Sequence, residues 1–73
     1  MPRFLIQFLE YGEWRTYGKS EESRRSINAS WYEFLREGWE YYDCQAGRII
    51  KIQQWAGKWM VREVVEYQEI KGD

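Results

Sequence analysis

The chain has 73 residues, and its 11 Lys and Arg against 12 Asp and Glu give a formal charge of −1. This length is about half that of a typical domain, so we expect one small domain over residues 1–73. Cys44 is the one cysteine, which excludes an internal disulfide, and histidine, the commonest general base and a usual zinc ligand, does not occur. We therefore predict no catalytic, metal-binding or cofactor-binding site.

The first predicted element is an antiparallel hairpin over residues 3–18. Phe4, Ile6 and Phe8 recur at period two, which is typical of a strand with one buried face. The dipeptide Gly12-Glu13 has Gly first, which favours a two-residue loop of type II′. This loop predicts three cross-strand pairs, namely Tyr11 with Trp14, Glu10 with Arg15, and Phe8 with Tyr17.

A helix is predicted next, over residues 21–37. We expect Ser20 to cap its N-terminus, because a serine hydroxyl accepts hydrogen bonds from the free N–H groups of a first turn. We expect Gly38 to follow its last turn as the residue that ends the helix. The helix would bury one apolar stripe of 3.6-residue period, made of Ile27, Trp31, Phe34 and Leu35.

The C-terminal part of the chain is predicted to form three more strands. In the last hairpin we expect Trp55 opposite Trp59, because this register sets Lys51 against Glu63 and also aligns Ile50 with Val64. A two-residue loop would instead set Lys51 against Arg62, a pair of like charges. The predicted strands are residues 39–44, 48–55 and 59–67, joined by turns at 45–47 and 56–58.

These elements predict an α+β fold in the order β-β-α-β-β-β, with an antiparallel sheet of about five strands and one helix on one face. Apolar residues nevertheless occur on both faces of the predicted strands. Either the sheet curls and buries its second face, or an aromatic-rich surface is left for a partner. The predicted partner-binding patch lies at the hairpin tips and comprises Tyr11, Trp14, Arg15, Trp55, Lys58, Trp59 and Arg62.

Two groups of residues could suggest catalysis, and we assign neither to it. Cys44 follows Asp43, whose charge would raise the pKa of the thiol, so we interpret Cys44 as a small apolar strand residue. Glu33 and Glu37 lie one helical turn apart, away from the apolar stripe, and we interpret them as part of a solvated face. We predict that the protein is not an enzyme.

A protein partner suits the predicted patch, because Trp, Tyr and Arg dominate the energetics of protein interfaces. We predict a small non-catalytic protein-binding module that inhibits a larger protein by steric occlusion. A single-stranded nucleic-acid-binding accessory protein is a second hypothesis, less favoured at a pI of 5.5, with a basic groove of Arg48, Lys51, Lys58 and Arg62. A third is a homodimer closed through the same patch.

The sequence also carries expectations about location. No run approaches the ~20 apolar residues of a membrane span, and the apolar run from Phe4 to Leu9 is too short for the core of a signal peptide. A single thiol suits a reducing compartment. We therefore expect a cytoplasmic protein without a membrane partner.

Three resemblances extend these hypotheses. Arg24-Arg25-Ser26, an aromatic helix and the segment 46–52 are similar to small phycobilisome linker domains, which implies a homodimeric structural protein of linker type. Residues 35–40 resemble a helix end in an uncharacterised family of small domains. In size and chemistry the chain also resembles phage-encoded inhibitors of host defence, including anti-CRISPR proteins, which implies a host protein or complex as target.

Overall fold

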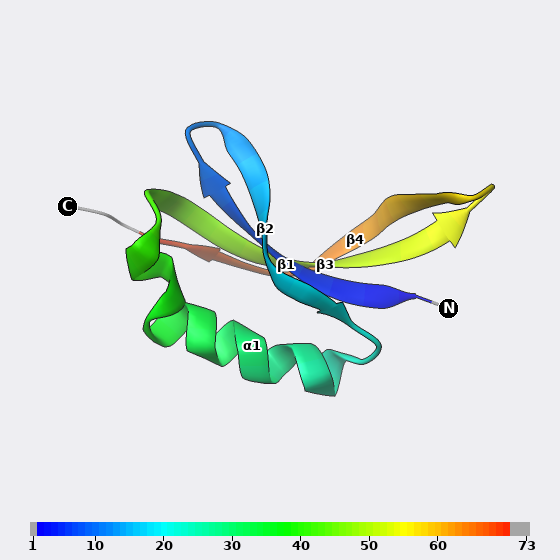
Figure 1. Ribbon diagram of the computed structural model, residues 1–73, viewed down its shortest axis with the longest axis horizontal. Coiled ribbons are helices and arrows are strands. Elements are labelled where there is room, and N and C mark those ends of the chain that lie inside the picture. The colour runs from blue at the N-terminus through cyan, green and yellow to red at the C-terminus, as the bar shows by residue number, and fades with distance from the viewer. Residues whose placement is uncertain (1, 71–73) are drawn as a thin grey trace.

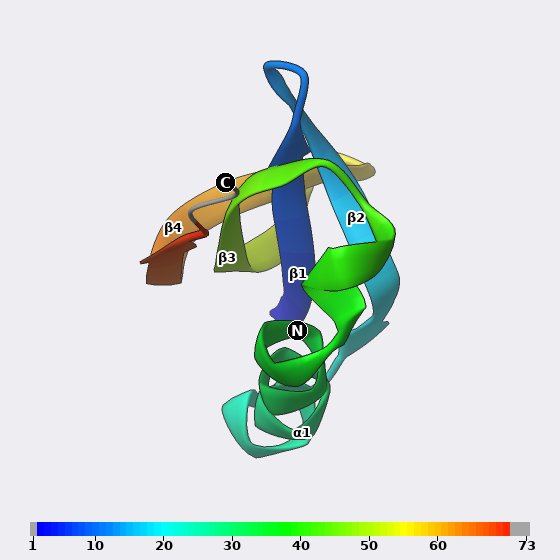
Figure 2. The same cartoon turned by 90° about the vertical axis from the view of Figure 1, so that its left-hand side faces the viewer.

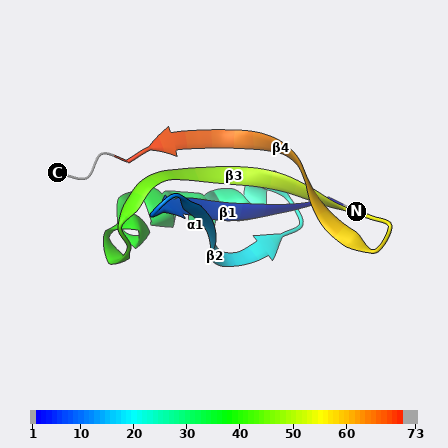
Figure 3. The ribbon, with the colours of Figure 1, turned by 90° about the horizontal axis from the view of Figure 1, so that it is seen from above.

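The computed structural model describes residues 2–70 and shows a small α+β domain with one helix packed on an antiparallel sheet (Figure 1). Within these residues the sheet has four strands in the order β2-β1-β3-β4, which Figure 3 shows side by side with the helix behind them. No helix among them is long and apolar enough to cross a membrane. The elements are β1 (Arg3–Glu10), β2 (Glu13–Glu21), α1 (Arg24–Arg36), the 3-10 helix η1 (Gly38–Tyr41), β3 (Cys44–Trp55) and β4 (Lys58–Glu69).

The core lies between α1 and one face of the sheet. Phe34 and Ile27 of α1 are fully buried, and Trp31 is nearly so. The predicted stripe is thus confirmed, with Leu35 half-buried at its border. The sheet contributes the predicted strand face of β1 and two residues of β3, and the buried cluster comprises Ile6, Phe8, Ile27, Trp31, Phe34, Cys44 and Ile49.

The predicted start of the helix is wrong by one turn. Ser23 is the N-cap, and its hydroxyl accepts a hydrogen bond from the backbone N–H of Ser26 at 3.0 Å. Ser20 and Glu21 belong to β2 instead, because Glu21 pairs with Phe4 and the Ser20 hydroxyl accepts a hydrogen bond from Arg3 Nε at 2.8 Å. Tertiary contacts with β1 therefore extend the strand at the expense of the helix.

The predicted strand over residues 39–44 is also wrong, which is why the sheet has four strands and not five. Residues Gly38–Tyr41 form η1, and Trp39 packs against the core cluster. The predicted turn at 45–47 is part of β3, where Gly47 pairs with Phe8. A short aromatic run satisfies a strand and a single helical turn equally well, and packing decides between them.

The loop of the first hairpin is shifted by one residue from the prediction. Tyr11 and Gly12 form the loop, both with positive φ, so that Leu9 pairs with Trp14 and the three predicted pairs do not occur. This is the loop geometry whose twist matches that of the two strands. Arg15 still reaches Glu10 diagonally, with Nε 3.1 Å from Oε1.

In the last hairpin the predicted loop is wrong, but two predicted cross-strand pairs further along the strands are correct. Ala56 and Gly57 form a two-residue loop with positive φ, so Trp55 pairs with Lys58 and not with Trp59. The predicted pairs of Lys51 with Glu63 and Ile50 with Val64 are confirmed. A β-bulge at Arg62 reconciles the two, because the extra residue removes Arg62 from the position opposite Lys51.

Candidate interaction surface

The seven residues of the predicted patch lie in two groups, because the two hairpin tips are at opposite ends of the sheet. β1 and β3 are antiparallel, with Glu10 paired to Cys44 and Arg3 paired to Ile52. The β1–β2 loop therefore lies beside the start of β3, and the β3–β4 loop lies beyond its other end (Figure 1). The first group is Tyr11, Trp14 and Arg15, and the second is Trp55, Lys58, Trp59 and Arg62.

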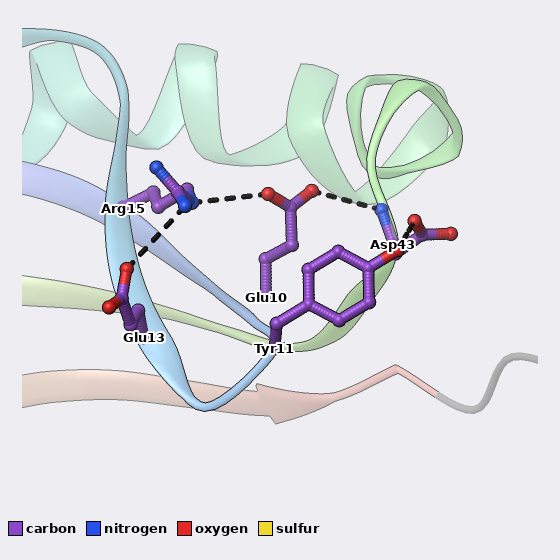
Figure 4. A network of polar contacts seen from close by, with 5 residues as sticks. All are labelled: Glu10, Tyr11, Glu13, Arg15 and Asp43. Atoms are coloured by element: carbon purple, nitrogen blue, oxygen red, sulfur yellow. Dashed lines mark hydrogen bonds and ion pairs between the residues drawn. The ribbon is translucent and has the colours of Figure 1, made fainter.

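Contacts within the chain hold the first tip in place (Figure 4). Arg15 lies between two carboxylates, with Nε 3.1 Å from Glu10 Oε1 and Nη2 3.5 Å from Glu13 Oε2. The Tyr11 hydroxyl donates a hydrogen bond to the Asp43 carboxylate, which raises the pKa of Tyr11. The backbone N–H of Asp43 in turn donates to Glu10 Oε2 at 3.2 Å, so this network ties the hairpin tip to the segment that precedes β3.

The sheet face opposite α1, which we call the open face, joins the two tips. Both hairpins bend away from the helix, so their tips rise on the open side of the sheet (Figures 1 and 2). The cross-strand pairing places four rows of residues on this face. They are Trp14–Leu9–Ala46–Glu69, Thr16–Gln7–Arg48–Tyr67, Leu5–Ile50–Val64 and Arg3–Ile52–Val61.

Two β-bulges place the apolar residues of β4 on the open face. Besides the bulge at Arg62, the register shifts at Val65, whose side chain packs against the core cluster on the helix side. Strand β4 therefore presents Trp59, Val61, Val64 and Tyr67 on one face at spacings of two and three residues. Strict alternation, which the sequence reading assumed, would have divided these residues between the two faces.

Exposure differs strongly across the open face. Ile50 and Ala46 on β3 are buried, whereas Trp59, Val61, Val64 and Tyr67 of β4 are 50%, 55%, 47% and 54% exposed. The curled sheet thus covers the middle of this face and leaves its β4 side in water. Trp59 also lines a depression on this face together with Leu5, Thr16 and Ile52.

The five tryptophans have different environments. Trp31 is buried in the core, and Trp14 and Trp39 are half-buried. Trp55 is 73% exposed and Trp59 is 50% exposed. Because Trp55 pairs with Lys58 and Trp59 with Gln54, the two exposed rings lie on opposite faces of the β3–β4 ribbon, contrary to the predicted register.

Arg48 occupies the middle of the open face and was not part of the predicted patch. Its Nε and Nη2 both donate to Gln7 Oε1, at 2.9 and 2.7 Å, and its guanidinium carbon lies 4.0 Å from the centroid of the Trp14 ring. Tyr67 meets Trp14 edge-on with ring centroids 6.4 Å apart. Burial lowers the pKa of Arg48, because the charged guanidinium has lost part of its water.

The acidic and thiol groups in the described residues form no metal-type cluster. Within residues 2–70, no three His, Cys, Asp or Glu side chains converge so as to hold a metal ion. Cys44 is buried, and burial, with smaller contributions from Glu10 and Asp43, raises its pKa to about 11. Asp43 thus acts on the thiol in the predicted direction, but burial is the larger cause.

Comparison with known proteins does not assign this chain to a family, so its function is argued from its own residues. The chain matches no protein-family model, no curated protein and no solved structure.

Proposed function

We propose that this chain is a non-catalytic protein-binding module that binds a larger protein through its open face. One observation carries the proposal: Trp59, Val61, Val64 and Tyr67 lie together on one face of β4 and are each about half exposed. Exposed apolar side chains are common singly, but a contiguous set of this kind is typical of an interaction site. Trp and Tyr are also the residue types that most often anchor a protein interface.

The size of the open face indicates that a partner must also contact the hairpin tips. Over the 8 residues of β1, at about 3.4 Å per residue, four strands about 4.8 Å apart present roughly 500 Å². A standard interface buries about 800 Å² on each partner. Tyr11 at the tip of the β1–β2 hairpin is 75% exposed and extends the contact at that end.

Steric occlusion is the mode of action that we propose for such a module. With the open face against its partner, the sheet and α1 behind it would cover a patch of the partner's surface and exclude other ligands from it. This mode needs no turnover and no cofactor, only an interface that dissociates slowly. It corresponds to the inhibitor function predicted from the sequence.

Site-specific photo-crosslinking tests the proposal. p-Benzoylphenylalanine replaces Val61 on the open face in one variant and Tyr32 on the exposed side of α1 in a control. In cells that produce the protein, we expect an adduct with one larger protein from position 61 and none from position 32. The additional substitution Val64→Glu should abolish the adduct while the circular dichroism spectrum is unchanged.

The same experiment can contradict the proposal. Equal adducts from both positions, or none from position 61, would exclude a specific partner at the open face. An adduct with a second copy of the chain would favour the homodimer hypothesis. An inhibitor further requires that the partner's own activity falls with 1:1 stoichiometry when the purified protein is added.

A further inference from the structure

Arg48, near the centre of the open face, has no counter-charge among the residues that the structure describes. Arg3, Arg15 and Arg24 each form an ion pair with a carboxylate of the chain. Arg48 forms none within residues 2–70, and its hydrogen-bond acceptor is the neutral side-chain amide of Gln7. Partial burial of a guanidinium without a carboxylate partner costs free energy, which a bound anion would offset.

The contacts of Arg48 fix the orientation of the guanidinium and leave some of its N–H donors free to bind an anion. Gln7 accepts hydrogen bonds from Nε and Nη2, and the guanidinium carbon lies over the Trp14 ring. No hydrogen bond from Nη1 occurs within residues 2–70, so donors remain on one edge of the fork. An oriented guanidinium with free donors matches the geometry of a carboxylate, which it can bind through two parallel hydrogen bonds.

We propose that the open face recognises a polypeptide segment in which an Asp or Glu side chain is flanked by apolar side chains. The carboxylate binds Arg48, and the apolar flanks pack on the exposed residues of β4, namely Val61, Val64 and Tyr67. This inference rests on the proposed protein-binding function and adds the chemistry of the partner. It follows from one cation, unpaired within residues 2–70, that lies beside the exposed apolar residues of β4.

Other occupants fit this face less well. A second copy placed face to face on a two-fold axis would bring two Arg48 side chains close together, which disfavours that dimer. A nucleic acid would meet Glu69 in the row next to Arg48. Addition of a strand to the β4 edge is hindered by the bulges at Arg62 and Val65, because a bulge interrupts the ladder of hydrogen bonds.

A phage-displayed library of random 12-residue peptides, selected on the immobilised full chain, tests the inference. We expect the enriched peptides to share an acidic residue between apolar residues. A synthetic peptide of the enriched sequence should bind roughly tenfold more tightly than its Glu→Gln or Asp→Asn counterpart, since a hydrogen bond between charged groups is lost in the latter. This comparison uses the unchanged protein and is independent of the stability of any variant.

Protein variants then assign the preference to Arg48. In Arg48→Gln, we expect the acidic peptide and its amide counterpart to bind with equal affinity. Arg25→Gln is the matched control, because Arg25 is exposed on α1, on the other side of the sheet, and its removal should leave the preference intact. Arg48→Lys should keep part of the preference, since it retains the charge but not the planar fork.

Several outcomes would overturn the inference. Enriched peptides without an acidic residue, an affinity difference below twofold, or a selection that enriches no peptide would each exclude this partner chemistry. The photo-crosslinking from position 61 is unaffected by such results, so protein binding can stand when the acidic preference fails. Binding of a dT12 oligonucleotide that weakens steeply with salt and disappears in Arg48→Gln would assign the face to nucleic acid instead.

Discussion

The ring of Phe34 lies against the backbone of Gly47, so that a Cβ at residue 47 would overlap the ring edge. The same Cβ would lie 3.3 Å from Cζ3 of Trp31. Gly47 is paired with Phe8 in the middle of the sheet, where a strand rarely favours glycine. Because Gly47 has no side chain, α1 can approach β3 closely.

Gly47→Ala is therefore expected to destabilise the protein by about 1–3 kcal/mol, the usual cost of overfilling a packed core. Urea unfolding followed by tryptophan fluorescence measures the change. In a Phe34→Leu background the smaller side chain should relieve the overlap, so the added alanine should cost less there. Equal costs in the two backgrounds would show that the two residues are not coupled.

Ser23→Ala should lower the free energy of unfolding by about 1 kcal/mol, because the first turn of α1 loses its side-chain cap. Ser23→Asp should retain the stability, since a carboxylate accepts the same hydrogen bond and suits the positive end of the helix. Chemical denaturation monitored by circular dichroism at 222 nm compares the variants. A loss that is as large in Ser23→Asp as in Ser23→Ala would contradict the capping role.

The stability should fall at alkaline pH, in part because of Tyr17. Burial, assisted by its hydrogen bond to Glu33, raises the pKa of Tyr17 from 10.0 to about 12. Between these values the unfolded chain has released a proton that the folded chain retains, so stability decreases as pH rises through this window and is complete below pH 10. Urea unfolding between pH 9.5 and 11.5 should show a shallower decrease for Tyr17→Phe than for the wild type, and equal slopes would exclude the assignment.

The thiol of Cys44 should react slowly in the folded protein. A pKa raised from 9.0 to about 11 reduces the thiolate at pH 8 by about a hundredfold, and burial adds a steric barrier. Titration with Ellman's reagent should therefore be at least a hundredfold slower in buffer than in 8 M urea. A difference below tenfold would indicate that the β1–β3 end of the sheet opens readily around Cys44.

Features that depend on local periodicity were predicted correctly, whereas the positions of the two hairpin loops were not. The helix stripe of Ile27, Trp31 and Phe34 and the buried face of Phe4, Ile6 and Phe8 follow from local periodicity, and the structure places both against the core. The two hairpin loops were misplaced because Tyr11 and Ala56 adopt positive φ, a conformation that sequence rules assign to Gly or Asn. Gly12 and Gly57 occupy the second position of these loops, where the positive φ is easily adopted.

The candidate surface was predictable only in part. Aromatic residues at the hairpin tips were found from the sequence, whereas the predicted patch omitted Arg48, Val61, Val64 and Tyr67. Arg48 becomes conspicuous only when three strands bring Gln7, Trp14 and Tyr67 around it. The alternation of Arg48 with Ile50 is the one local signal that could have placed it on an apolar face.

The residue sequence by itself determined that there is one amphipathic helix, that the strands are antiparallel, and that the apolar rings are more than this helix can cover. These properties depend on composition and on periods of two and 3.6 residues. Tertiary structure alone decided the strand count, both loop registers and the bulges at Arg62 and Val65. These depend on hydrogen bonds between strands that are distant in the chain, and a shift of one residue there moves a side chain to the opposite face. The bulges place Val61, Val64 and Tyr67 together in water, and for that reason the open face could be identified only from the folded chain.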